Sequence, residues 1–279
     1  MAEIGLTEVS DVAREEISSQ LQSFLIEEAI VLPTVTRFTA AQGMDSMKLP
    51  KVDAFVVNDK TENTAVTAQE LTATSDILLL DKEKVVHFAI ENRAKDQSAV
   101  NFESAGLERA AKAMALQVDK DLITQLKLVS SAGPDHSLAY ANFATDNTFG
   151  RDDLIAAKIL LRKQQLRFDQ CVCLVSPEAE GDLLKVDDFV HVDKYGSNDA
   201  IRNGQIGKLY GLPIMVSTEI AEFETLIYHP SHVAYASQRT MQIERDRNIK
   251  TLSDEYSVHM LYGAKVLDDG IRGVLLGTA

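Results

Sequence analysis

The chain has 279 residues, with 28 Lys and Arg against 42 Asp and Glu, and so a formal net charge of −14. Hydrophobic residues make up 45% of it and there are only 2 Cys, which is typical of a globular protein and not of a disordered or disulfide-stapled one. The acidic balance argues against a nucleic-acid-binding protein, because phosphate contacts need a basic surface. No apolar run reaches a membrane span and the acidic first residues are unlike a secretory signal, so we expect neither membrane insertion nor secretion.

The first segment, residues 1–42, is interpreted as a short helix followed by an arm. Between residues 11 and 30 the apolar positions recur at helical spacing, and Pro33 is expected to end the helix because proline has no N–H to donate. These apolar positions are Val12, Ile17, Leu21, Phe24, Leu25 and Ile30.

Residues 43–76 form a long segment with no strong pattern of burial. Stretches 46–51 and 55–57 could be strands, and the threonines at 61, 64, 67, 72 and 74 favour extended chain over helix. Two interpretations remain open. The segment is either a long surface hairpin or an extended arm that is buried against another chain.

Regular structure returns at residues 77–80 and 84–90, which are predicted as strands. In the second run Val86, Phe88 and Ile90 alternate with the residues between them. His87 is expected to be a half-buried sheet residue and not a metal ligand, because no second His or Cys lies near it in sequence.

The strongest predicted helix covers about residues 101–127 and would be about 40 Å long. Its apolar residues form one helical stripe, and nearby alanines raise the helix propensity. The stripe consists of Leu107, Ala111, Met114, Val118, Leu122 and Leu126.

A second mixed section begins near Gly150. Asp152 and Asp153 favour a helix start, and Ser176 and Pro177 are typical of the N-cap and first turn of a short helix ending at Leu184. The first helix is expected to bury Leu154, Ile155, Ala157, Ile159, Leu160 and Leu161. Residues 204–212 are expected to be a loop, and strands are predicted at 171–175, 213–216, 225–228, 233–235, 241–244, 256–266 and 271–276. The fold class is therefore α+β.

The sequence offers weak candidates for chemistry. Cys171 and Cys173 lack the spacing of a redox or zinc motif and are interpreted as buried structural residues. His229 and His232 flank Pro230 and Ser231, which suggests a turn. His191 and Asp193 could be a base and its orienting carboxylate in a soluble enzyme, but no nucleophile or phosphate-binding motif accompanies them. We therefore predict no catalytic, cofactor-binding or metal-binding residues, and no cofactor.

The order of elements, together with three stretches, resembles the major capsid protein of tailed bacteriophages. The first stretch leads from Asp96 into the long helix that contains residues 118–123. The second is Gly207-Lys-Leu-Tyr-Gly211-Leu-Pro213 followed by an apolar strand and Ser217, and the third is Tyr262-Gly263-Ala264-Lys265-Val266 before a glycine-bounded strand. This family has the fold named after the Hong Kong phage, which encapsulin shells share.

The resemblance implies a fold with four parts: an N-terminal helix and arm (1–42), an extended loop (43–76), a peripheral domain (77–150 and 236–279) with its spine helix at about 101–127, and an axial domain (151–235). It implies a non-enzymatic viral structural protein that self-assembles as a homo-oligomer into pentamer and hexamer capsomers of an icosahedral capsid. The shell encloses double-stranded DNA without sequence-specific binding, is part of the virion, and is assembled in the host cytoplasm. The runner-up is an encapsulin-type nanocompartment shell.

Two departures from the family's pattern shape the expected partners. Some members begin with a scaffolding segment of roughly a hundred residues, whereas about 40 residues precede the loop here, so the resemblance implies a separate scaffolding protein, with a portal and possible decoration proteins as further partners. Some members cross-link subunits through Lys and Asn. Lys48, Lys51 and Lys60 lie in the loop, but no partner Asn can be identified, so no cross-linking residue is assigned.

Overall fold

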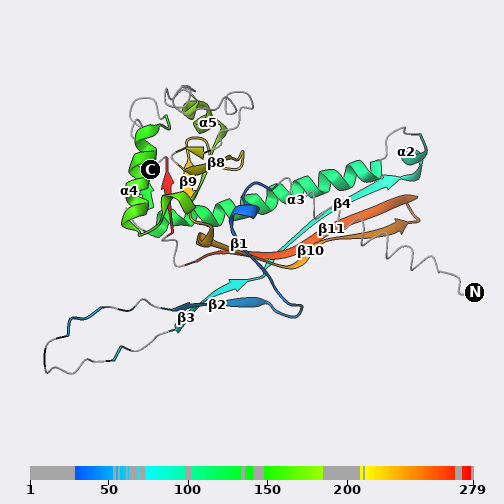
Figure 1. Cartoon of the computed structure of the whole chain (residues 1–279). Coiled ribbons are helices and arrows are strands. Elements are labelled where there is room, and N and C mark those ends of the chain that lie inside the picture. Colours follow the sequence, from blue (N-terminus) through cyan, green and yellow to red (C-terminus); the bar gives the residue numbers. More distant parts are fainter. Residues whose placement is uncertain are drawn as a thin grey trace, which may run out of the picture.

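The computed structural model describes residues 29–52, 55, 57–60, 62, 68–69, 73–97, 102–132, 136–140, 148–184, 208–209, 211–267 and 272–277. Within these ranges the chain forms a four-stranded sheet, a six-stranded sheet and a separate two-stranded hairpin (Figure 1). The helix expected over residues 11–30 lies outside the described residues except for its last two positions. Pro33 lies in the short 3-10 helix η1 (Leu32–Thr34).

The four-stranded sheet has the order β1-β10-β11-β4, from β1 (Thr36–Thr39), β10 (Val233–Asn248), β11 (Ser253–Val266) and β4 (Lys82–Glu91). β1 is parallel to β10, and the other neighbours are antiparallel. The helix α3 (Phe102–Leu126) lies along this sheet (Figure 1). Short helix α2 (Asn92–Gln97) follows β4. The predicted strand 84–90 and the spine helix are thus confirmed to within two residues at each end.

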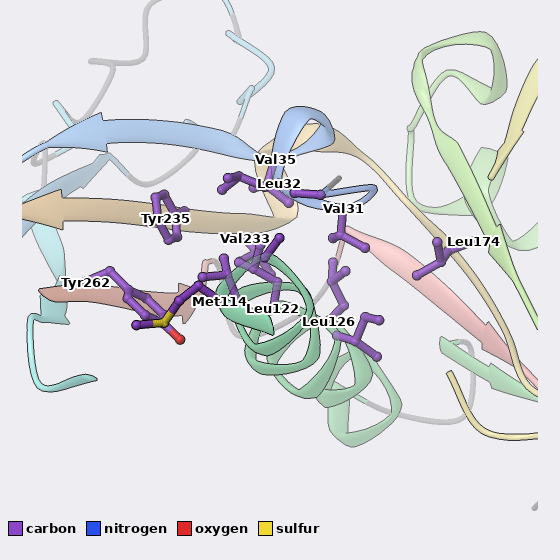
Figure 2. Close-up of a cluster of buried hydrophobic side chains, with 14 of the residues drawn as sticks. Val31, Leu32, Val35, Met114, Leu122, Leu126, Leu174, Val233, Tyr235 and Tyr262 are labelled. Carbon is purple, nitrogen blue, oxygen red and sulfur yellow. The ribbon is translucent and has the colours of Figure 1, made fainter. Parts of the chain in front are cut away.

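The helix α3 is long because one stripe of it is buried from end to end. All six stripe residues predicted from the sequence are at most 7% exposed. At 1.5 Å per residue its 25 residues span about 37 Å. The core along it includes Met114 and Tyr262 near the four-stranded sheet and Leu126 and Leu174 toward the six-stranded sheet (Figure 2). The helix therefore connects the cores of the two sheets.

A buried carboxylate on α3 holds the start of the described chain. The Asp119 side chain accepts hydrogen bonds from the backbone N–H groups of Ile30 (2.7 Å), Val31 (3.2 Å) and Leu32 (3.1 Å). Burial raises the pKa of Asp119, and these three bonds oppose the rise. The arm that leads into β1 is thereby fixed to the middle of the spine helix.

The six-stranded sheet has the order β5-β12-β9-β6-β8-β7. Its strands are β5 (Ser137–Leu138), β6 (Val172–Val175), β7 (Lys208–Leu209), β8 (Leu212–Val216), β9 (Thr225–Tyr228) and β12 (Gly273–Leu276). Three short 3-10 helices adjoin this sheet: η2 (Lys127–Ala132) between α3 and β5, η4 (Phe168–Gln170) before β6, and η6 (Pro230–His232) between β9 and β10. β7 falls in the stretch that was expected to be a loop.

Two helices accompany the six-stranded sheet, α4 (Arg151–Lys163) and α5 (Pro177–Leu183). The predicted starts are confirmed: Asp153 accepts a 2.8 Å bond from the Gly150 N–H, and the Ser176 hydroxyl accepts one from the Ala179 N–H at 3.3 Å. The predicted buried side of α4 is partly wrong, because Ile155 and Ile159 are 41% and 55% exposed. They lie outside the face that packs on the sheet.

Residues 233–235 and 241–244 were predicted as two separate strands, and this prediction was wrong. The two stretches belong to one strand, β10, which is interrupted by register shifts between Ser237 and Arg239 and between Arg239 and Gln242. The polar residues between the two apolar runs broke the sequence pattern, but backbone pairing with β11 continues on both sides of the irregularity. Gln238 donates from its amide to the carbonyls of Ala41 and Met44, which explains a polar residue here.

The extended loop begins and ends as a hairpin of β2 (Ser46–Val52) and β3 (Ala73–Leu79), paired from Ser46↔Leu79 to Val52↔Ala73. Both strands were predicted, although β3 begins four residues before the expected position. Phe55 and Val57 are not in a strand. The hairpin projects from the body of the molecule (Figure 1).

Candidate assembly surface

The hairpin exposes apolar side chains on one of its faces. Leu78 and Leu80 are buried at 0% and 8% exposure, whereas Ile77 and Leu79 on the other face are 44% and 56% exposed. Farther along the loop, Phe55 and Val57 are 64% and 93% exposed. Apolar side chains gathered on a projecting element mark an interaction surface more often than isolated exposed ones do.

The base of the hairpin, in contrast, has a small core of its own. Leu78 and Leu80 pack with Ala40, Ala234 and Ala236, and the half-buried Met47 and Leu49 of β2 join them. The sequence pattern indicated no burial anywhere in this segment, but the base of the hairpin is buried. Beyond the base, Phe55 and Val57 are described residues whose apolar side chains remain exposed.

A close backbone approach fixes where the hairpin meets the sheet. A Cβ added at Gly263 of β11 would lie 2.0 Å from the Leu79 carbonyl oxygen and 2.9 Å from Leu78 Cδ2. Only glycine permits β3 to cross β11 at this distance. Gly263 thus sets the position from which the arm leaves the body.

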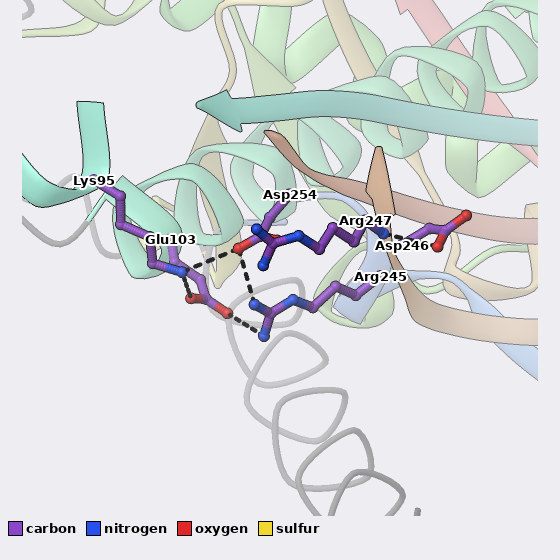
Figure 3. Close-up of polar contacts among 6 residues, drawn as sticks. All are labelled: Lys95, Glu103, Arg245, Asp246, Arg247 and Asp254. Carbon is purple, nitrogen blue, oxygen red and sulfur yellow. Dashed lines mark hydrogen bonds and ion pairs between the residues drawn. The ribbon is translucent and has the colours of Figure 1, made fainter. Parts of the chain in front are cut away.

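The opposite end of the four-stranded sheet carries a four-residue ionic cluster (Figure 3). Asp254 of β11 lies 3.0 Å from Arg245 Nη2 and 3.4 Å from Lys95 Nζ, and Lys95 also lies 3.4 Å from Glu103. Burial alone would raise the pKa of Asp254, but the hydrogen bonds from Arg245 and Lys95 outweigh it and lower the pKa. The cluster connects α2, the start of α3, β10 and β11.

Exposed apolar residues lie at the same end of the sheet. Ile249 and Leu252, in the turn between β10 and β11, are 79% and 59% exposed, and Phe102 at the start of α3 is 43% exposed. The Leu252 carbonyl accepts a 3.1 Å hydrogen bond from the Asn92 N–H, which joins the turn to α2. The tip at this end of the sheet is therefore partly apolar, and it is stabilised by the ionic cluster and by this hydrogen bond.

The residues considered for chemistry are dispersed. Cys171 and Cys173 are buried and unpaired, and burial raises the pKa of Cys171 to about 11, so both thiols stay neutral. His229 precedes the 3-10 helix η6 as its N-cap and His232 is its last residue, so the predicted turn is confirmed. His191 and Asp193 lie outside the described residues. Within the described ranges, no three His, Cys, Asp or Glu side chains gather closely enough to hold a metal ion.

His87 was expected to be half-buried, but its side chain is 56% exposed, with Nε2 3.9 Å from Glu255. The ring points away from α3, because its neighbours Val86 and Phe88 take the side of the sheet that packs on the helix. Of the lysines considered for cross-linking, Lys48 and Lys51 are on β2 and Lys60 is exposed beyond it. None of the helices in the described part of the chain could span a membrane.

The fold is shared with solved phage capsid structures. The chain aligns with that of Mycobacterium phage Che8 at a TM-score of 0.66 and 24% identity, covering 84% of each chain. It aligns with the capsid of Ralstonia phage GP4 at a TM-score of 0.69 and 14% identity, covering 88% and 87%. A virus-like particle from Pyrococcus furiosus gives a TM-score of 0.62 and 13% identity, covering 95% and 99%. The α+β fold is therefore the Hong Kong phage capsid fold that the sequence resemblance implied.

The sequence comparison then gives the family. The family model described as phage capsid protein matches residues 79–275, more than half of the chain. The chain therefore belongs to the phage capsid protein family. The major capsid protein of Escherichia phage T5 is 32% identical over 104 residues, which cover 35% of this chain and 22% of that protein, so the chain spans about a fifth of this relative's length.

Sequence reasoning missed two parts of this surface. The ionic cluster joins residues as distant as Lys95 and Asp254, and no local pattern brings them together. The two faces of β3 could not be told apart from the sequence, because residues 77–80 are all apolar. That apolar run predicted a strand but not which of its faces would remain uncovered.

Proposed function

We propose that this chain is the major capsid subunit of a tailed phage, which self-assembles in many copies into the pentamers and hexamers of an icosahedral shell around double-stranded DNA. The observation that carries the proposal is the projecting hairpin with its uncovered apolar side chains. Family membership supports the same role.

The energetics of the arm favour a binding site on a neighbouring copy. Burying a Phe or Val side chain contributes about 1.5–3 kcal/mol. Phe55 and Val57 leave most of this free energy unused in the isolated subunit, since they are 64% and 93% exposed. In a closed shell every copy would supply one arm and receive one, so a modest gain per arm is repeated around the particle.

The proposed division of labour follows the resemblance. Residues 151–235 form the axial domain around the capsomer axis, and residues 77–150 and 236–279 form the peripheral domain, with α3 as its spine, that contacts other capsomers. Residues 43–76 lie over a neighbouring subunit, and residues 1–42 form an arm. In the described fold β12, from the range 236–279, pairs with β9 of the axial range, so the two domains share one sheet.

The proposed partners are other copies of the chain, a separate scaffolding protein, a portal and possible decoration proteins. The net charge of −14 suits a container from which DNA must leave, because an acidic wall does not hold phosphate tightly. The subunit would have no catalytic role and no cofactor, would be assembled in the host cytoplasm, and would remain in the virion.

The encapsulin-type shell is less well supported. The likeness to the Pyrococcus furiosus particle is one of fold, at 13% identity, whereas the family model and the T5 relative are both phage proteins. The number of subunits per particle and the presence of a portal at one vertex separate the two functions.

The arm hypothesis can be tested by shortening the loop without disturbing its base. Replacing residues 53–72 with Asn-Gly would connect Val52 directly to Ala73 through a two-residue turn, because these residues already pair across the hairpin. We expect a folded subunit with wild-type thermal melting that fails to form closed shells. Electron microscopy and sedimentation velocity would measure assembly.

A point variant with a matched control isolates the apolar contacts. Phe55→Asp with Val57→Asp adds two negative charges at the exposed apolar positions, and Asn58→Asp with Lys60→Ser changes the net charge equally at neighbouring exposed polar positions. We expect shells from the control pair only. Shells of normal yield from the Phe55 and Val57 pair, or an unfolded shortened chain, would show that the loop is not an assembly arm.

A further inference from the structure

Three crossovers connect the two sheets, and they meet at one junction. α3 passes through η2 to β5, β9 passes through η6 to β10, and β11 leads into β12. The crossovers are hydrogen-bonded to one another. The His229 N–H donates to the Arg272 carbonyl at 3.0 Å, the Leu267 N–H donates to the His232 carbonyl at 2.8 Å, and His136 Nδ1 donates to the Gly273 carbonyl at 3.0 Å.

A buried histidine occupies this junction. His232 is the last residue of η6 and is 0% exposed. Among the described residues, neither of its ring nitrogens makes a hydrogen bond of good geometry, and the Leu126 carbonyl at the end of α3 is the polar group that favours its protonated form. A neutral ring is buried here at a moderate cost, whereas a charged ring would cost much more and would have only the Leu126 carbonyl to offset that cost.

The charged and titratable groups that act on His232 make protonation harder still. Arg272, from the crossover before β12, donates to the Ser231 hydroxyl at 2.6 Å, and His136 lies on the crossover before β5. Burial lowers the pKa of His232 to about 4, the Leu126 carbonyl opposes this, and Arg272 and His136 add to the lowering. Burial and Arg272 also lower the pKa of His229 on the same turn.

We propose that His232 is an acid-sensitive latch: the three crossovers close around its neutral, buried ring, and protonation of the ring opens their junction at the end of α3. The inference concerns the subunit itself. It can therefore be tested on unassembled chains, and its failure would leave the proposed shell function unaffected.

The direction of the pH effect follows from linkage. In the opened junction His232 regains an ordinary pKa near 6.5, whereas in the closed junction the pKa is about 4. The closed state is therefore favoured fully above pH 6.5 and loses that advantage as the pH falls toward 4. The full difference corresponds to a change on the order of 10²-fold in the equilibrium between closed and open junctions.

Hydrogen exchange of the unassembled full-length chain tests the latch directly. Peptides that cover residues 228–233 should exchange faster at pH 4.5 than at pH 7 by at least tenfold after correction for the intrinsic rate, while peptides from the middle of α3 stay protected. His232→Phe and His232→Gln should abolish the increase because neither side chain titrates. His87→Gln, an exposed histidine of β4, is the matched control and should retain it.

Two results would overturn the proposal. One is an equal increase in the His232 variants, and the other is an increase that spreads uniformly to α3, which would indicate global unfolding. If neither variant folds, exchange of the ring C2 hydrogen of His232 in the wild-type chain, followed by mass spectrometry, gives its titration midpoint. A midpoint well below 6 supports the latch, and a midpoint near 6.5 rules it out.

Discussion

The spine helix and the hairpin arm differ in where their apolar residues find burial. Every stripe residue of α3 is covered within the subunit, by the two sheets and by the arm segment that Asp119 holds. The hairpin buries its base against β10 and β11 but leaves Phe55, Val57, Ile77 and Leu79 largely exposed. The body can therefore be stable alone, whereas under the proposed function the arm would gain most of its apolar burial from another molecule.

The strongest test of the body's independence is a charge on the buried stripe. Met114 is 2% exposed and lies between α3 and the sheet (Figure 2). Met114→Asp should lower the free energy of unfolding by about 3–5 kcal/mol, because the carboxylate would be buried without a partner. Leu116→Asp, on the same helix at 47% exposure, is the control and should cost less than about 1 kcal/mol. Urea denaturation measures both, and equal effects would mean that the stripe is not the core.

A smaller effect is expected where the arm meets the body. Gly263→Ala places a methyl group 2.0 Å from the Leu79 carbonyl oxygen, so β3 must move away from β11. We expect a loss of about 1–3 kcal/mol and a reduced yield of shells, because the arm leaves from a changed position. Gly181→Ala in α5 has nothing within 4 Å and should instead stabilise by up to about 1 kcal/mol. Normal melting and assembly of Gly263→Ala would show that the crossing tolerates a shift.

The smallest predicted effect concerns the ionic cluster at the tip (Figure 3). Asp254→Asn should cost about 1 kcal/mol at neutral pH, since its partners Arg245 and Lys95 are themselves 49% and 41% exposed and water screens the pairs. The lowered pKa of Asp254 means that its contribution is present above the ordinary carboxyl pKa, near 3.9, and is lost as the pH falls through the lowered value. The difference between wild type and variant in urea midpoint should therefore shrink toward pH 3. Glu83→Gln, at an exposed position of β4, should have the same urea midpoint as the wild type at both pH values.

The sequence predicted those parts of the fold in which burial is periodic. The stripe of α3 and the alternation Val86, Phe88, Ile90 of β4 both indicate a single buried face, and both elements were found within two residues of the expected bounds. β10 could not be predicted as one strand. Its charged residues 244–247 are held by backbone pairing with β11, and backbone hydrogen bonds leave no periodic signal in the side chains.

The candidate surface could be predicted only in part, for a related reason. The lack of a burial pattern in residues 43–76 left open a surface hairpin or an arm buried on another chain, and it did not show that Met47 and Leu49 are packed at the base. Ile155 and Ile159 of α4 show the converse, since apolar residues were assumed to be covered and are exposed. Sequence shows which residues are apolar, whereas topology decides which of them the subunit itself covers.

The pairing of β12 constrains when a nascent chain can complete its fold. Val274 of β12 pairs with Ile227 of β9, and Leu275 of β12 pairs with Ser137 of β5. The strand β12 is therefore synthesised about 50 residues after β9 and about 140 residues after β5. Until residue 276 has left the ribosome, the six-stranded sheet remains divided into two pieces. Long-range closure of this kind is slow. Translation itself thus delays the appearance of subunits that are ready to meet one another.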